Sequence, residues 1–230
     1  MDERDRRIAE AVAALRARFG ERQRGTPSLA DPTPLGTGPR NRHGMPQCPP
    51  NQNVVSKTSW PVLDLGETPL VERADWRLEV DGACEAPITI TMADLLALPQ
   101  VAAEADFHCV TGWSVLDLAL GGVALETVLA LARPRADATH LMCHGADGYS
   151  TNLPLEEATK PDVLVVHTAE GAPLPAAHGG PVRIVTPQLW AWKGAKWLRR
   201  LELLTHDRRG YWEIRGYSNT AHPWRDDRSW

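Results

Sequence analysis

The sequence has no long apolar run and no strongly basic segment. Although 43% of its 230 residues are hydrophobic, no stretch approaches the roughly 20 apolar residues that a membrane-spanning helix needs. The formal net charge is −4, and basic residues do not interleave with aromatic ones as they do on nucleic-acid surfaces. We therefore expect neither a membrane nor a nucleic acid as a partner. A chain of this length can bury a sizeable core.

The sequence also lacks the usual signatures of bound electron carriers. Its four cysteines, Cys48, Cys84, Cys109 and Cys143, are widely spaced and include no Cys-x-x-Cys pair. There is no iron–sulfur cysteine cluster, no haem segment and no glycine pattern of a dinucleotide-binding fold. Nothing points to export, so we expect the thiols to be reduced.

Residues 1–50 differ in character from residues 51–230. The segment 2–24 repeats apolar residues at helical spacing, which predicts an amphipathic helix that docks on its own domain or offers a handle to a partner protein. Residues 25–50 are rich in Pro, Gly, Thr and Asn and are typical of a surface linker. Further charges, rather than an apolar core, follow the basic pair Arg6-Arg7, so we expect no export signal and a cytoplasmic protein.

Residues 51–230 are expected to form one α+β domain that is mostly β, with mixed sheets and short helices. Residues 91–94, Thr-Met-Ala-Asp, resemble a capping box and predict a short helix. A second short helix is expected over residues 127–131, after a turn at Gly121-Gly122. Apolar or alternating runs of strand length lie at 139–143, 163–168, 182–186 and 198–204.

Cys109 ends a short alternating run and stands just before Gly112, where a strand should meet a turn. A thiol at such a junction can face a pocket while the strand holds its backbone still. This placement suits a soft metal ligand or a nucleophile. The alternative is a buried apolar cysteine, which is common in proteins.

A zinc site is a second possibility for this thiol. His108 and Cys109 are adjacent, as are Cys143 and His144, so these four residues include two nitrogen and two sulfur donors. Adjacent donors, however, lack the spacing of two to four residues that is usual between zinc ligands.

Several segments together resemble the sulfite-oxidase-like molybdopterin oxidoreductases. They are His-Cys-Val-Thr-Gly-Trp-Ser at 108–114, the segment from Gly-Ala-Asp-Gly-Tyr to Glu-Glu-Ala at 145–158, His-Gly-Gly-Pro-Val-Arg at 178–183 and Lys-Gly-Ala-Lys-Trp-Leu at 193–198. The resemblance runs in family order from about Trp60 to the C-terminus. It implies the fold of the family's molybdopterin-binding domain without the separate dimerisation domain of the longer sulfite oxidases.

The resemblance implies that Cys109 is the protein ligand of a molybdenum ion held by molybdopterin, and that the enzyme transfers an oxygen atom to or from a small oxo substrate. Because the chain has no electron carrier of its own, a separate redox protein would exchange the electrons. Tyr149 matches a tyrosine that faces the reacting oxygen, although a strand tyrosine pointing outward is the alternative. A binding module on the same fold without a working metal centre is the non-enzymatic alternative.

The pterin phosphate needs fixed donors, and the resemblance assigns them to the segments at 178–183 and 193–198. Arg183 offers a planar fork and Lys196 a point charge. His178 is placed to donate to the pterin, and the backbone amides of Gly194 and Ala195 can approach an oxyanion closely. Asp147 is the last of the expected cofactor residues. The resemblance implies that it holds the pterin ring system, and a turn aspartate is the alternative.

The sequence departs from the sulfite oxidases directly after the cysteine. Those enzymes carry an arginine-containing segment there, whereas this chain has Thr111-Gly112-Trp113. Burying a dianion without its full set of partners is costly, so we expect a neutral S-oxide or N-oxide rather than sulfite. The segment 216–224 resembles the closing segment of the methionine-sulfoxide-reductase-like members, which points the same way.

The chain contains nine tryptophans, three of them close together at Trp190, Trp192 and Trp197. Such a cluster can form a stacking platform for bases or sugars. In an acidic chain, packing in the core and around a pocket is the interpretation we favour.

Overall fold

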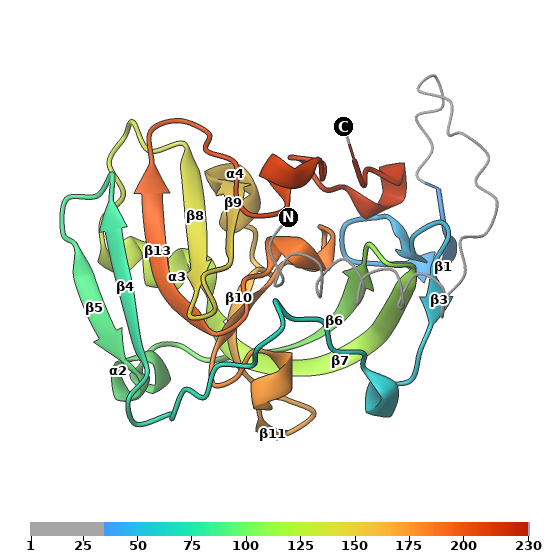
Figure 1. The fold of residues 1–230 in the computed structure, drawn as a ribbon, viewed down its shortest axis with the longest axis horizontal. Coiled ribbons are helices and arrows are strands. Elements are labelled where there is room, and N and C mark those ends of the chain that lie inside the picture. Colours follow the sequence, from blue (N-terminus) through green and yellow to red (C-terminus); the bar gives the residue numbers. More distant parts are fainter. Residues whose placement is uncertain (1–34, 230) are drawn as a thin grey trace.

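The computed structural model describes residues 35–229, so the amphipathic helix expected over residues 2–24 lies outside the described part. Two twisted sheets dominate the architecture, and only short helices interrupt them (Figure 1). This arrangement confirms the mostly β, mixed-sheet α+β fold expected from the sequence. Within residues 35–229, no helix combines the length and apolar character needed to cross a membrane.

The larger sheet is built around a long strand, β7 (Trp113–Ala124). β7 pairs antiparallel with its neighbours β6 and β10, and parallel with the short β3. The other strands of this sheet are β3 (Asn53–Val54), β6 (Val101–Cys109), β10 (Leu164–Ala169), β11 (Ala172–Pro173) and β12 (Arg183–Val185). Cys109 and Arg183, the expected metal ligand and the expected phosphate-binding residue, therefore belong to one sheet.

The second sheet has the order β5-β4-β13-β8-β9 and is mixed, because β13 runs parallel to β4 and antiparallel to β8. Its strands are β4 (Arg77–Gly82), β5 (Ile88–Thr91), β8 (His140–Gly145), β9 (Ser150–Pro154) and β13 (Leu198–Leu204).

The α-helices of the described residues are short: α2 (Met92–Ala97), α3 (Leu125–Leu131) and α4 (Leu155–Ala158). Single 3₁₀ turns are η1 (Lys57–Ser59), η2 (Ala176–His178), η3 (Ala191–Lys193), η4 (Glu213–Arg215) and η5 (Pro223–Arg225).

The main core joins the two sheets. Buried and exposed residues alternate along β4, because Leu78 and Val80 are fully buried while Arg77 and Glu79 are exposed. Apolar residues of both sheets and of α2, α3 and α4 pack into this core, among them Leu78, Val80, Leu95, Val128, Ala158, Val165, Ile184 and Leu201. Burying such a side chain stabilises the fold by about 1.5–3 kcal/mol.

The capping box at the start of α2 is confirmed. The Thr91 hydroxyl accepts a hydrogen bond from the Asp94 amide at 3.1 Å, and an Asp94 carboxylate oxygen accepts one from the Thr91 amide at 2.8 Å. These two bonds satisfy amide groups that the first turn of a helix leaves without partners. The helix then ends at Ala97.

The turn expected at Gly121-Gly122 is wrong, because both glycines lie inside β7. A Cβ on Gly121 would stand 2.2 Å from the Thr168 hydroxyl oxygen, and one on Gly122 would stand 2.3 Å from the Val165 carbonyl oxygen. The pair therefore allows β10 to approach β7 closely. Glycine inside a strand can serve this purpose as well as a turn.

The linker expected over residues 25–50 also needs correction where the structure describes it. β1 (Thr37–Arg40) and β2 (Pro46–Cys48) form an antiparallel hairpin that packs on the domain. Its Gln47 side chain donates to Asp117 at 2.8 Å, and the Trp224 indole donates to the Pro46 carbonyl at 2.5 Å. The folded domain thus starts before residue 50, since the polar, glycine-rich segment finds its partners in distant parts of the chain.

Candidate active site

One pocket collects nearly all the site residues expected from the sequence. Its volume is about 820 Å³ with the solvent at its mouth included. The expected residues that line it are Cys109, Asp147, Tyr149, His178, Arg183, Gly194 and Lys196. Ala195 is fully buried behind this lining.

Cys109 occupies the junction that the sequence predicted. It is the last residue of β6 and pairs in register with Trp113 of β7, so the chain reverses within four residues. The Gly112 amide donates to the Cys109 carbonyl at 3.1 Å, and Gly112 has a φ of +98°, which favours glycine. The thiol is 8% exposed and opens onto the pocket, with its Sγ 3.1 Å from the Thr111 hydroxyl oxygen.

Arg183 is a buried cation whose partners are neutral. Only 3% of the residue is exposed, and its guanidinium donates to the carbonyls of His178 at 2.9 Å and Gly194 at 3.3 Å. The Phe107 ring lies 4.9 Å from the guanidinium carbon. Burial lowers the pKa of Arg183 to about 10. Within the described part of the chain, no carboxylate forms an ion pair with it.

Lys196 is the second cation of the pocket. Its ammonium donates to the Ala177 carbonyl at 3.0 Å and lies 4.2 Å from the centre of the Trp197 ring. Burial, followed by repulsion from Arg183, lowers its pKa to about 7, and the carboxylates of Asp64 and Asp147 offset this only in part. Among residues 35–229, Lys196 has no ion-pair partner. Two poorly neutralised cations in one pocket make it a site for an anion.

His178 borders both cations. Its ring stacks on Trp60 with the centroids 4.0 Å apart and the planes 11° from parallel. Burial, together with the charges of Arg183 and Lys196, lowers the pKa of His178 to about 4, so the ring is neutral at neutral pH. A neutral imidazole keeps one donor and one acceptor for a ligand.

The two small residues before Lys196 are placed differently from each other. The Gly194 amide donates to the Ala191 carbonyl at 3.1 Å, so this amide already has a protein partner. A Cβ on Gly194 would stand 2.4 Å from the Ile184 carbonyl oxygen, which explains the need for glycine there. Ala195 holds the adjacent strand in place, because its carbonyl accepts from the Ile184 amide at 3.0 Å.

Asp147 and Tyr149 form one turn between β8 and β9. An Asp147 carboxylate oxygen accepts from the Tyr149 amide at 3.1 Å, so the turn-aspartate interpretation is confirmed while the side chain also lines the pocket. The Tyr149 hydroxyl donates to the Trp192 carbonyl. Burial raises the pKa of Tyr149 well above its usual value, so the phenol stays protonated and acts as a donor.

The aromatic wall of the pocket could not be assigned from local sequence patterns. It contains Trp60, Phe107, Trp113, Trp192, Trp212 and Tyr217. The tryptophan count pointed to core and pocket packing, and both occur: Trp190 and Trp197 are fully buried, whereas Trp192 lines the pocket. Contacts between distant segments decide whether a given tryptophan packs in the core or lines the pocket.

The alternative zinc donors do not converge. The His108 ring bonds to the Ser114 hydroxyl at 2.8 Å on the six-stranded sheet, and the His144 ring contacts Glu202 at 3.1 Å on the five-stranded sheet. Cys143 is fully buried in the core. Over the described residues, no group of three or more His, Cys, Asp or Glu side chains is arranged to hold a metal ion. The zinc interpretation is therefore wrong.

Comparison with known proteins assigns the class. Residues 65–212 match the family model of the oxidoreductase molybdopterin binding domain, which is more than half of the chain. The protein belongs to this family of molybdopterin-dependent oxidoreductases, and its cofactor is molybdenum-molybdopterin.

Individual relatives agree with this family. The chain is 38% identical over 181 residues to the uncharacterized oxidoreductase YuiH of Bacillus subtilis, which covers 78% of this chain and 90% of that protein. It is 26% identical to the protein-methionine-sulfoxide reductase catalytic subunit MsrP of Gluconobacter oxydans, covering 78% of this chain and 65% of MsrP. The structure resembles the sulfane dehydrogenase SoxCD of Paracoccus pantotrophus with a TM-score of 0.57, at 26% identity, over 60% of this chain and 40% of that one.

The residues of the pocket fit this cofactor. Its phosphate requires positive charge. Arg183 supplies a buried cation and Lys196 a partly buried one, and among the described residues neither has a carboxylate in ion-pair contact. A molybdenum ion also held by sulfur favours a soft thiolate donor, and Cys109 opens onto the same pocket. Neutral His178 and the Asp147 turn supply further polar groups on the wall.

Proposed function

We propose that this protein transfers an oxygen atom to or from a small S-oxide or N-oxide, with Cys109 as the protein ligand of the molybdenum. The observation that carries the proposal is the shared pocket, in which one thiol and two cations without carboxylate ion pairs among the described residues face the same space. A binding module without a metal centre would also use such cations to hold an anion, but it has no need of a thiol in the same pocket. The oxidoreductase function is therefore favoured over the non-enzymatic alternative.

The polar residues that the resemblance assigned to the cofactor each have a proposed task. Arg183 and Lys196 bind the phosphate, with the guanidinium held in place by its bonds to backbone carbonyls. His178 and Asp147 contact the pterin. When bound, the cofactor supplies the two-electron oxygen-atom exchange, while the protein orients the reactants and excludes water. No bound electron carrier is expected from the sequence, so a separate redox protein exchanges the electrons.

The charges of the pocket favour a neutral substrate. Arg183 and Lys196 are the cationic side chains among the described residues that line it, and both are assigned to the phosphate. The wall near the thiol is instead formed by Val110, Phe107 and Trp113. Sulfite would enter this site without a cationic partner, which costs about 1–3 kcal/mol or more. The name of the MsrP relative, a methionine-sulfoxide reductase, supports an S-oxide.

Tyr149 is proposed to orient the substrate. Its raised pKa keeps the hydroxyl protonated, so it can donate to a neutral oxo group but cannot serve as a base near neutral pH. To do so, the hydroxyl would exchange its present bond to the Trp192 carbonyl for one to the substrate. Tyr149→Phe should then raise the KM for an S-oxide while cofactor content is unchanged.

The substrate assignment is tested with reduced dyes as electron donors and with sulfite oxidation measured in parallel. We expect turnover of an S-oxide or N-oxide well above any sulfite oxidation. Val110 lines the pocket, whereas Gly112 has a positive φ and does not, so Val110→Arg is the variant that returns charge to the site. This variant should move the preference towards sulfite. Efficient sulfite oxidation by the unmodified protein would contradict the substrate assignment but not the cofactor.

A further inference from the structure

The Thr111 hydroxyl group has one hydrogen-bond partner, and this partner is the Cys109 thiol. Thr111 is 2% exposed, and its Oγ1 lies 3.1 Å from the Cys109 Sγ. Within residues 35–229 the hydroxyl has no other hydrogen bond. A buried hydroxyl without a partner is destabilising, so the Sγ contact is its means of satisfying this requirement.

The turn that carries Thr111 is held from both sides. The Gly112 carbonyl accepts two hydrogen bonds from Asn53, from its amide at 2.9 Å and from its side chain at 3.1 Å. The Val110 carbonyl accepts one from the Arg228 guanidinium. Thr111 thus lies between two anchored residues, and its hydroxyl is held against the sulfur by the backbone as well as by the bond itself.

The direction of this bond follows from the chemistry of the ligand. In the free thiol, either group can be the donor. A thiolate bound to metal has no proton, so in the loaded enzyme the hydroxyl must donate and the sulfur must accept. A hydrogen bond to a ligating sulfur reduces the electron density that the sulfur gives to the metal.

We propose that Thr111 is a positioning residue that orients the Cys109 thiolate and, through its hydrogen bond, raises the reduction potential of the molybdenum. This inference rests on the proposed ligand role of Cys109. Reduced electron donation from the sulfur destabilises the more oxidised metal relative to the more reduced one. The presence of Thr111 therefore favours reduction of the centre, which suits an enzyme that removes oxygen from an S-oxide or N-oxide.

The test compares Thr111→Val, which keeps the shape and removes the hydroxyl, with Thr111→Ser, which keeps the hydroxyl. The midpoint potential is measured by redox titration of the paramagnetic one-electron-reduced molybdenum signal, with molybdenum content determined on the same samples. We expect Thr111→Val to shift the one-electron equilibrium up to tenfold towards the oxidised metal. This shift corresponds to a fall of up to about 59 mV in the midpoint potential. Thr111→Ser should retain the potential of the unmodified protein.

Thr111→Ala provides a second hydroxyl-free variant in case the valine variant fails to fold. Unchanged potentials in the hydroxyl-free variants would overturn the proposal. Loss of molybdenum from both of them, with retention by Thr111→Ser, would also overturn it, because the hydroxyl would then act in metal retention. Cys109→Ser is measured beside these variants, so that an error in the role of Thr111 can be distinguished from an error in the assignment of Cys109 as the metal ligand. If Cys109→Ser leaves the molybdenum signal unchanged, Cys109 is not the ligand and the premise itself is wrong.

Discussion

The Lys193 ammonium and the Glu213 carboxylate lie 2.7 Å apart, and neither side chain is exposed to solvent. Lys193 also donates to the side-chain and backbone oxygens of Asn152, at 2.9 and 3.1 Å. The Glu213 carboxylate accepts further bonds from the Thr151 hydroxyl at 2.9 Å and from the Trp192 indole at 3.2 Å. The ion pair therefore joins η3, β9 and η4 behind Trp192, which lines the pocket. In Figure 1 the C-terminal segment, drawn in red, lies beside β9 and above the six-stranded sheet.

Breaking this pair on one side should destabilise the protein strongly. Glu213→Gln leaves the Lys193 charge buried without its counter-ion, which costs about 3–5 kcal/mol. Replacing both residues, as in Lys193→Met with Glu213→Gln, should recover part of that loss, because no buried charge remains and the glutamine amide oxygen can still accept from Thr151 and Trp192. The free energy of unfolding, measured by urea denaturation, checks both expectations.

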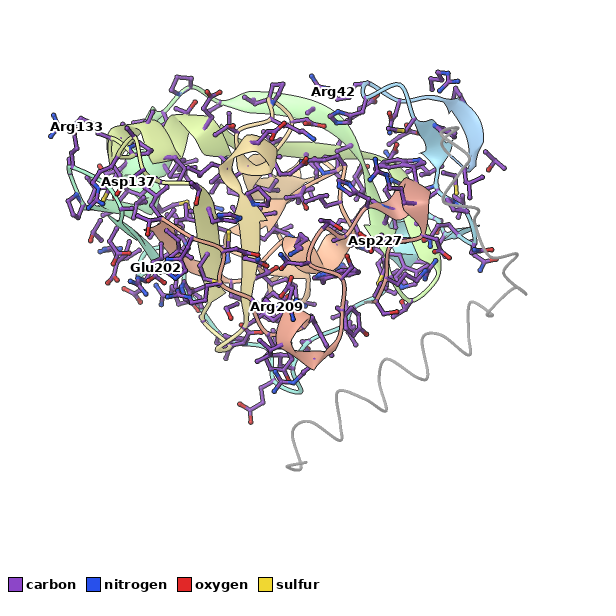
Figure 2. The ribbon with its side chains drawn as sticks, turned by 90° about the horizontal axis from the view of Figure 1, so that it is seen from above. Arg42, Arg133, Asp137, Glu202, Arg209 and Asp227 are labelled. Carbon is purple, nitrogen blue, oxygen red and sulfur yellow. The ribbon has the colours of Figure 1, made fainter. Side chains whose placement is uncertain are left out.

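An exposed ion pair provides the matched control. Arg135 and Asp137 form an ion pair with side chains 48% and 55% exposed, and Asp137 lies at the outer edge of the molecule (Figure 2). Asp137→Asn should leave the unfolding midpoint close to that of the unmodified protein. If Glu213→Gln lowers the free energy of unfolding as little as Asp137→Asn does, the buried pair does not hold the C-terminal segment in place.

Removing Arg183 should reduce cofactor content. Arg183→Ala deletes a buried cation that we assign to the cofactor phosphate. Truncating one partner of a buried cation–anion pair costs about 2–5 kcal/mol of binding free energy. Pterin and molybdenum should fall together in the purified variant, whereas Arg135→Ala should retain both. Thermal unfolding of the cofactor-free proteins shows whether the loss reflects binding rather than folding. Full pterin content in stable Arg183→Ala would remove Arg183 from the phosphate site.

The lowered pKa of Lys196 predicts a pH dependence for the cofactor-free protein. In the folded state this pKa is about 7, against an ordinary value of 10.5, so between these pH values the unfolded chain binds more protons. The free energy of unfolding contributed by Lys196 therefore rises as the pH increases from about 7 to 10.5. The difference between the unmodified protein and Lys196→Met, followed by denaturation across this range, should show the rise.

Cofactor binding should abolish this pH dependence, because a bound phosphate keeps Lys196 charged. Lys57 contacts Glu170 at the surface, and Lys57→Met should behave like the unmodified protein throughout. A pH profile of Lys196→Met that runs parallel to that of the unmodified cofactor-free protein would contradict the lowered pKa of this partly buried ammonium.

The fold and the centre of the site could be predicted because their signals are local. The capping box at Thr91 and the strand-to-turn junction at Cys109 each lie within a few consecutive residues, and both are confirmed. The phosphate motifs at Arg183 and Lys196 were found by resemblance, and the structure brings them into one pocket.

What could not be predicted depends on contacts between distant segments. Gly121 lies in a strand because Thr168 packs against it, and no turn signal distinguishes this case. Glu213 was missed because its partner Lys193 is twenty residues earlier in the sequence. Trp60 stacks on His178 across more than a hundred residues, so its place in the pocket follows only from the folded chain.

The assignment of Cys109 as the metal ligand is tested most directly by the number of sulfur atoms bound to molybdenum, measured by X-ray absorption at the molybdenum edge. The unmodified protein and Cys109→Ser are compared, with Cys143→Ser as a control because Cys143 is fully buried away from the pocket. We predict that Cys109→Ser has one sulfur ligand fewer per molybdenum and no oxygen-atom transfer, while Cys143→Ser matches the unmodified protein. An unchanged sulfur count in molybdenum-loaded Cys109→Ser would contradict the assignment of Cys109 as the metal ligand.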